Sequence, residues 1–151
     1  MVLGIVIAIL LHTKNTFALS GTMPETGARI KIEKEWKGYN CGYTKATRMI
    51  LYTEDQWKEI WGKAQVLRLP KPELPKIDFE KEMVIAVFMG ERSSGGYSIE
   101  IIKIIRTEKE IVVEVEEKEP PSESLRTMAL TQPYHIVVIK KSPLPIRFQS
   151  P

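Results

Sequence analysis

The feature that most constrains the fold is an uninterrupted apolar run from Met83 to Met89, which follows Glu82 and stops at Gly90. The run has the length of a strand, and it lacks the alternation of polar and apolar residues that marks a strand with one face in water. Such a strand is covered on both faces. The sequence therefore predicts a central strand that is buried on both sides.

Other stretches with strand character surround this run. Over Arg29–Trp36, charged and apolar residues alternate, which is typical of a half-buried strand. The other predicted strands are Arg48–Tyr52, Tyr97–Ile105, Ile111–Glu117, Thr127–Thr131, His135–Ile139 and Ile146–Phe148. These spacings predict a mostly β fold, a β-sandwich or partly open barrel of about seven or eight antiparallel strands.

One helix is predicted, beginning after Thr53. Thr53 and Gln56 have the spacing of a capping box, in which a Thr cap is followed by Gln three residues later. Apolar residues then recur at helical spacing, at Trp57, Ile60, Trp61 and Ala64. This pattern favours a helix packed on the sheet. The alternative is that the two tryptophans line a ligand or peptide groove.

Residues 1–18 have the pattern of an export signal. The apolar run from Val2 to Leu11 is short for a membrane span but matches the hydrophobic region of a signal peptide. Thr16-Phe17-Ala18 resembles a cleavage site, with cleavage after Ala18. We predict a signal peptide over 1–18, a linker over 19–28 and a single domain over 29–151. The protein would be exported to the periplasm, cell surface or medium. An uncleaved N-terminal anchor is the alternative, and it is the only membrane attachment predicted.

Charge and cysteine content exclude several kinds of partner. The net charge is only +3, from 22 basic and 19 acidic residues, and no basic run exceeds two residues. A nucleic-acid partner requires a basic stripe and is therefore not predicted. Cys41 is the only cysteine, and after cleavage His135 would be the only histidine. Neither a disulfide within the chain nor a Cys/His zinc site can form, so no metal or cofactor is predicted.

The Ser, His and Cys residues of the sequence do not form a recognisable catalytic motif. A triad around His135 would need a nucleophile, but Ser93 and Ser94 do not lie in a Gly-x-Ser-x-Gly elbow. A Cys41/His135 dyad is conceivable, yet nothing beside Cys41 indicates a depressed thiol pKa. We predict that the chain is not an enzyme and has no catalytic residues. A small hydrolase that uses His135 is kept as an alternative.

A glycine-containing loop, Gly90–Tyr97, separates two predicted strands. Its Ser93-Ser94-Gly95-Gly96 segment could bind phosphate through N–H groups, but phosphate loops lead into a helix and carry Lys or Gly-x-Gly-x-x-Gly. Two hypotheses remain. The loop is a hairpin connection with glycine at positive φ, or it is a protein-contact loop that uses Arg92 and Tyr97, residue types favoured at interfaces.

Several motifs, taken in order, resemble a known family. They are Glu54-x-x-Trp57-x-x-x-Trp61, Asp78-Phe79-x-x-Glu82 with the run to Gly90, Ser94-Gly95-Gly96-Tyr97-Ser98-Ile99, and Thr131-Gln132-Pro133-Tyr134-His135-Ile136-Val137. Over roughly Lys45 to Phe148, the chain resembles the C-terminal domain of PrcB-type protease-complex proteins. The resemblance implies an exported accessory protein associated with a protease complex.

A second likeness concerns two loops. Ser93–Tyr97 and Gln132–Tyr134 are similar to two of the three loops with which chagasin-like inhibitors bind cysteine proteases. The segment Glu119–Arg126 lacks the glycines of the third loop. We therefore predict an exported, non-catalytic protein-binding domain whose partner is a protein such as a protease, with protease inhibition as an alternative. The predicted binding residues are Arg92, Ser93, Ser94, Gly95, Gly96, Tyr97, Gln132, Pro133 and Tyr134.

Overall fold

A computed structural model describes residues 27–151. The predicted signal peptide lies outside these residues, as does most of the predicted linker. The described part contains eight strands and one helix. They are β1 (Ala28–Arg29), β2 (Lys34–Gly38), β3 (Thr47–Leu51), α1 (Glu54–Ala64), β4 (Glu82–Phe88), β5 (Ser98–Arg106), β6 (Ile111–Lys118), β7 (Tyr134–Lys140) and β8 (Ile146–Gln149).

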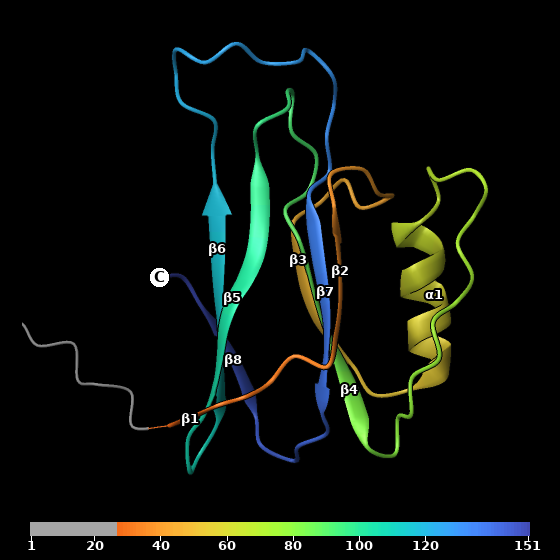
Figure 1. Cartoon of the computed structure of the whole chain (residues 1–151), viewed down its shortest axis with the longest axis vertical. Helices are drawn as coiled ribbons and strands as arrows, with labels where there is room; N and C mark the ends of the chain where they lie inside the picture. The colour runs from red at the N-terminus through yellow and green to blue at the C-terminus, as the bar shows by residue number, and fades with distance from the viewer. Residues whose placement is uncertain (1–26) are drawn as a thin grey trace, which may run out of the picture.

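The strands form two four-stranded sheets that pack face to face. One sheet has the order β1-β5-β6-β8, and the other has the order β2-β7-β4-β3. The helix covers the outer face of the second sheet, so the molecule has three layers (Figure 1). The predicted β-sandwich with one packed helix is confirmed.

Strand β4 lies at the centre of this arrangement, between β7 and β3. Side chains alternate across a strand, so β4 contributes to both cores. Val84, Ala86 and Phe88 pack with the helix, whereas Met83, Ile85, Val87 and Met89 pack against the other sheet. No residue from Met83 to Met89 is more than 2% exposed. The prediction of a strand buried on both faces is confirmed.

The helix begins as its sequence predicts. Thr53 Oγ1 accepts a hydrogen bond from the Gln56 N–H at 3.3 Å, while Gln56 Oε1 accepts from the Tyr52 N–H at 2.9 Å. The reciprocal bond of the capping box thus reaches one residue further back than the usual motif. Trp57 and Trp61 are buried and contact Trp36 of β2, with ring centroids 5.5 and 5.4 Å away. The two tryptophans therefore pack the helix on the sheet, as the first interpretation predicts.

Two predicted strands are wrong in extent. Arg29–Trp36 is not one strand, because the chain crosses from β1 in one sheet to β2 in the other within this stretch. Ile30 and Ile32, which create the alternating pattern, pack against the core between the sheets at the crossing. Thr127–Thr131 is not a strand either. Only Thr131 forms a bridge, to Arg92, because no neighbouring strand is there to pair with the rest.

Two predicted connections also differ. The Gly90–Tyr97 loop is not a hairpin, because β4 and β5 belong to different sheets and the loop crosses between them. The positive φ expected at glycine is nevertheless present, at 79° for Gly90 and 89° for Gly96. Not all strands are antiparallel, since β8 pairs with β6 in parallel. The chain reaches β8 from β7 of the other sheet rather than through a hairpin, so its direction is not tied to that of β6.

Candidate functional site

The two loops predicted to form a binding edge lie side by side at one end of the sandwich. Arg92 and Thr131 exchange main-chain hydrogen bonds of 2.8 and 2.9 Å, and Thr131 Oγ1 donates to the Ser94 carbonyl at 2.8 Å. The Gly95 N–H donates to the Thr127 carbonyl at 3.0 Å. Segments that lie almost forty residues apart in the sequence are thus joined into one surface (Figure 1).

Glycine is required at both ends of the Gly90–Tyr97 loop for two reasons. The backbone there has positive φ, and neighbouring atoms leave no room for a side chain. A Cβ atom on Gly90 would lie 2.7 Å from the Ala46 nitrogen, and one on Gly96 would lie 2.6 Å from the Pro120 Cβ. Both distances are too short for a side chain. The glycines therefore allow the loop to lie against the β2–β3 and β6–β7 connections.

The nine predicted binding residues differ in exposure. Ser93 and Gly96 are exposed, and Arg92, Gly95 and Tyr97 are half-buried. The Arg92 guanidinium lies over the Tyr97 ring, 5.7 Å from its centroid, so these two side chains contact each other. The other four are buried, namely Ser94, Gln132, Pro133 and Tyr134.

The buried residues Gln132–Tyr134 hold neighbouring segments together. Gln132 donates through its N–H to the Tyr39 carbonyl at 2.7 Å and through Nε2 to Glu91 Oε2 at 3.0 Å. The Tyr134 hydroxyl accepts from Nε2 of the fully buried Gln65 at 3.2 Å. These contacts connect the glycine loop, the β2–β3 connection and the end of α1. The three residues thus support the surface from beneath.

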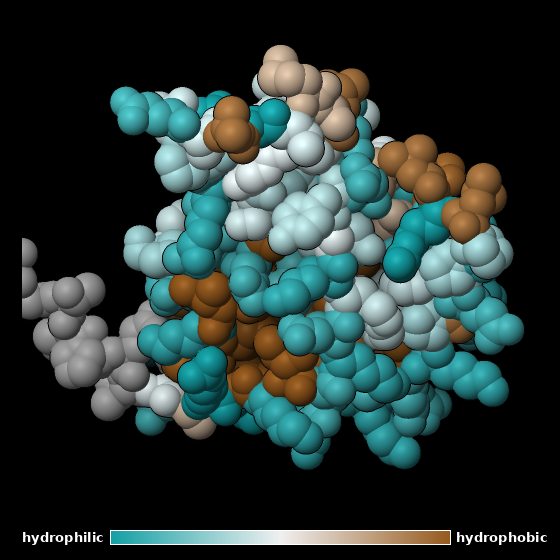
Figure 2. Space-filling model, turned by 45° about the horizontal axis from the view of Figure 1, so that its top comes forward, coloured by the Kyte–Doolittle hydropathy of each residue, from teal (hydrophilic) through white to brown (hydrophobic). Residues whose placement is uncertain are grey.

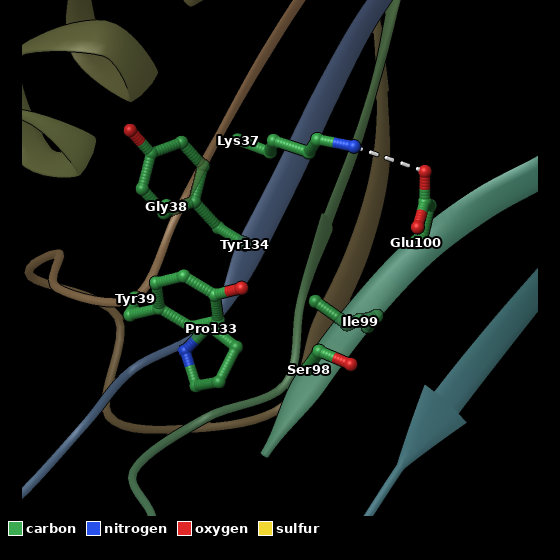
Figure 3. A pocket seen from close by; sticks show the side chains of 8 residues that line it. All are labelled: Lys37, Gly38, Tyr39, Ser98, Ile99, Glu100, Pro133 and Tyr134. Carbon is green, nitrogen blue, oxygen red and sulfur yellow. Dashed lines mark hydrogen bonds and ion pairs between the residues drawn. The ribbon is translucent and has the colours of Figure 1, made fainter. Parts of the chain in front are cut away.

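A cleft of about 230 Å³ opens beside these loops, between β2 and β5. Figure 3 shows Tyr39 and Pro133 facing Ser98 and Ile99 across it. The remaining lining residues are Lys37, Gly38, Glu100 and Tyr134. The cleft is next to both predicted loops, since Ser98 directly follows the first loop and Pro133 and Tyr134 belong to the second.

An ion pair crosses the cleft from β2 to β5. Lys37 Nζ donates to Glu100 Oε1 at 3.1 Å, and both side chains are about half exposed (56% and 45%). The hydrogen bond from Lys37 lowers the pKa of Glu100, and the same bond raises the pKa of Lys37. Because water screens an exposed pair, its contribution to stability is small.

His135 lies deeper on the same side of the sandwich and is fully buried. Its Nδ1 accepts the Ile101 N–H at 2.9 Å, so the ring proton is on Nε2, which donates to Glu35 Oε2 at 3.1 Å. Burial lowers the pKa of His135, although the hydrogen bond to Glu35 opposes this. Both ring nitrogens are thus engaged in joining β7 to β5 and β2.

Cys41 and His135 do not form a catalytic pair. Cys41 packs in the core on the helix side, where its Sγ donates to the Gln132 carbonyl at 3.4 Å. His135 points toward the other sheet, because it alternates along β7 with residues of the helix-side core. Desolvation raises the pKa of the Cys41 thiol, which disfavours the thiolate that a nucleophile requires. Within residues 27–151, no group of three or more His, Cys, Asp or Glu side chains is placed to hold a metal ion.

Comparison with known families identifies the segment that builds this end of the molecule. Residues 83–140 match the family model described as PrcB C-terminal. This segment is PrcB C-terminal-like. The match confirms the resemblance over a shorter stretch than the motifs indicate, and it runs from β4 through β7. No curated protein and no solved structure gives a match to the chain. No helix in the described part of the chain is long and apolar enough to cross a membrane.

The PrcB C-terminal-like segment also carries exposed apolar residues that the sequence reasoning missed. Leu125 is fully exposed, Met128 is 90% exposed and Leu130 is 60% exposed, all in the β6–β7 connection. Hydrophobic groups stand out at this end in Figure 2, which brings it forward. The sequence does show these apolar residues, in a stretch rich in Pro, Ser and Thr. Met128 and Leu130, however, lie within the predicted strand Thr127–Thr131, so they were not expected to be exposed.

Proposed function

We propose that the chain is an exported, non-catalytic protein-binding domain that acts as an accessory or stabilising subunit of a protease or envelope complex. The observation that carries the proposal is the presence of three exposed apolar side chains in the β6–β7 connection, at Leu125, Met128 and Leu130. A concentration of exposed large apolar residues in one loop supports its use as an interaction site. The match to the PrcB C-terminal family supports the association with a protease complex.

The β6–β7 connection is held in place by its own hydrogen bonds. The Arg126 guanidinium donates to the carbonyls of Pro121 and Ser122, at 2.9 and 3.1 Å, and the Ser124 N–H donates to Pro121 at 3.1 Å. The bonds of Thr127 and Thr131 to the glycine loop fix the other end. A preorganised loop loses less conformational entropy on binding, which supports its use as a contact surface.

A photo-crosslinking amino acid at Met128 in the full chain tests the proposal in intact envelopes. We expect a crosslink to a protease or to another subunit of a protease complex, identified by mass spectrometry. The matched control places the same group at Tyr52, which is 40% exposed and lies after β3, away from the loop surface. A partner that crosslinks equally from both positions, or from neither, would contradict the proposal.

Export is supported by the pattern of residues 1–18. We expect the protein recovered outside the cytoplasm to begin at Leu19, as measured by intact mass and N-terminal sequencing. An extracytoplasmic protein that retains Met1 would instead favour the N-terminal anchor. Recovery in the cytoplasm alone would overturn export.

Protease inhibition is not favoured by the positions of the loop residues. The inhibitor-like arrangement requires Gln132–Tyr134 to reach a protease, and these residues are buried. Titration of papain-like and subtilisin-like proteases with the full chain is expected to leave their activity unchanged. The hydrolase alternative is not favoured either, because both ring nitrogens of His135 are engaged in the fold.

A further inference from the structure

Strand β5 has one edge that is only partly covered. On the side away from β6, β1 pairs with Arg106 and Ile105, and the Ile30 N–H donates to the Ile104 carbonyl at 2.8 Å. The chain then leaves for the other sheet. Among residues 27–151, no strand lies beside Ser98–Ile102 on this side. The Ile101 N–H on this side is already bonded to His135, and the Ile102 carbonyl accepts from the Arg29 guanidinium at 3.4 Å. The free edge is therefore the beginning of β5, Ser98–Glu100, and a free edge can pair with another strand.

The unpaired main-chain groups at the beginning of β5 are those of Ile99, and they point into the cleft. The Ile101 N–H is directed away from β6, since it donates to His135. Residues two apart in an antiparallel strand direct their main-chain groups to the same side. The pairing of Ser98 through Ile101 with β6 is regular, and the register shifts only beyond Ile101. The N–H and carbonyl of Ile99 thus face the cleft, which Ile99 lines.

The opposite wall of the cleft is suited to contact with an apolar side chain rather than with a charged one. Tyr39 is 60% exposed and faces the β5 edge across the cleft with Pro133 (Figure 3). Lys37 and Glu100 close one end but neutralise each other. The cleft therefore offers a hydrogen-bonding edge, an aromatic wall and no net charge.

We propose that this cleft binds a short extended polypeptide segment of a partner protein, which pairs with the main chain of Ile99 at the beginning of β5 as an added strand. The proposal rests on the proposed function in one respect, that the partner is a protein. Unpaired N–H and carbonyl groups are complementary to an extended main chain, and strand addition at a sheet edge is a general mode of peptide recognition. Strand β1 already occupies the other end of the same edge in this way. Because the main chain supplies most contacts, recognition tolerates different sequences, with one apolar side chain against Tyr39.

A displayed library of random ten-residue peptides, panned against the full chain, provides the probe. The selected peptide is titrated into ¹⁵N-labelled full chain, and we expect amide shifts confined to residues 37–39 and 98–101. Tyr39→Ala should weaken binding several-fold, while the matched Tyr52→Ala should leave it unchanged. Failure to select any peptide, or shifts centred on residues 125–130, would overturn the proposal.

Peptide chemistry tests the main-chain pairing without altering the fold. The selected peptide is synthesised with N-methyl groups at one or the other alternating set of residues. We expect one set to lose at least about tenfold in affinity, because its N–H groups face β5, while the other set changes little. Equal behaviour of the two sets would overturn strand addition.

Failure here and failure of the proposed function can be told apart. If Met128 crosslinks to a protease-complex subunit but no peptide enters the cleft, only the strand-addition proposal fails. If peptides bind at Ile99 while Met128 gives no crosslink, only the proposed loop surface fails.

Discussion

The two interfaces that share β4 are built from different residue types. Between α1 and its sheet lie aromatic rings, and Trp57 and Trp61 approach each other with centroids 5.1 Å apart. Between the two sheets, most buried side chains are Ile, Val or Met. Branched aliphatic side chains fit the pleated surfaces of facing sheets, whereas large rings fill the wider gap beneath a helix. One strand can serve both interfaces because its side chains alternate between its two faces.

Each interface also contains a polar connection between buried side chains or main-chain groups. Gln65 joins the end of α1 to Tyr134, and His135 joins β7 to Ile101. Tyr134 and His135 are neighbours in sequence but point to opposite interfaces. The Gln132-Pro133-Tyr134-His135 segment thus connects the three layers of the molecule, and its buried side chains stabilise the fold.

The largest expected effect comes from Trp57→Ala, which tests whether the two interfaces fold as one unit. Trp57 is fully buried, and its Nε1 donates to the Pro75 carbonyl at 2.9 Å. We expect a loss of roughly 3–5 kcal/mol in the free energy of unfolding. The matched change in the other interface, Ile104→Ala, should cost about 2–5 kcal/mol. Urea unfolding followed by fluorescence and circular dichroism should give a single transition in each variant, and two separate transitions would show that the interfaces are independent.

His135→Leu should cost about 1–3 kcal/mol, because the buried Ile101 N–H loses its acceptor while the core volume is nearly kept. The substitution should also change the pH dependence of stability. Burial lowers the pKa of His135 in the folded state, so the unfolded chain binds the proton more readily. Stability from this group is complete above the unfolded pKa of about 6.5 and is lost as pH falls through the folded pKa.

The pH dependence can be measured by urea unfolding at about pH 7.5 and about pH 5, values on either side of the unfolded histidine pKa. The groups around His135 are Glu35 and Lys37 of β2 and Glu100 of β5. The wild-type chain should lose more stability than His135→Leu over this range. Identical losses would mean that the histidine does not contribute.

Tyr134→Phe probes the polar connection of the helix interface. It removes the acceptor for Gln65 Nε2, which is buried, and leaves the ring against Phe88 in place. We expect a loss of about 1–2 kcal/mol in unfolding free energy, from the unpaired amide. Urea unfolding measures this loss, and unchanged stability would show that the buried amide of Gln65 does not depend on the Tyr134 hydroxyl.

Lys37→Met gives the smallest expected effect. The Lys37–Glu100 pair is exposed, so its loss should change stability by less than about 0.5 kcal/mol. The same variant removes the ion pair that closes one end of the cleft. Thermal unfolding checks the first point, and a change above about 1 kcal/mol would show that the pair joins the sheets in the way His135 does.

Much of the architecture could be predicted because it depends on local patterns. The apolar run Met83–Met89 and the cap at Thr53 specify β4 and α1 from adjacent residues alone. The sheet to which each strand belongs depends on contacts distant in sequence, so the crossings after Arg29 and Gly90 were not predicted. The parallel pairing of β8 has the same cause.

The candidate site could be predicted only in part. Glycine loops between strands are visible in a sequence, and the Gly90–Tyr97 loop lies at the surface beside Thr131 as a result of its glycines. The exposure of individual side chains is not visible there. Met128 is the more apolar of the pair Tyr134 and Met128, yet Tyr134 is buried and Met128 is 90% exposed.

The position of β4 has a consequence for the unfolded chain. Met83–Met89 combines strand-forming and apolar residues without a charge or a proline, which is the composition of an aggregation-prone segment. In the folded molecule, strands on both sides and layers above and below conceal it. Glu80, Lys81 and Glu82 precede it as charged gatekeepers. Refolding yield should therefore fall steeply with protein concentration, because the strand on which both interfaces depend is also the one that self-associates when it is uncovered.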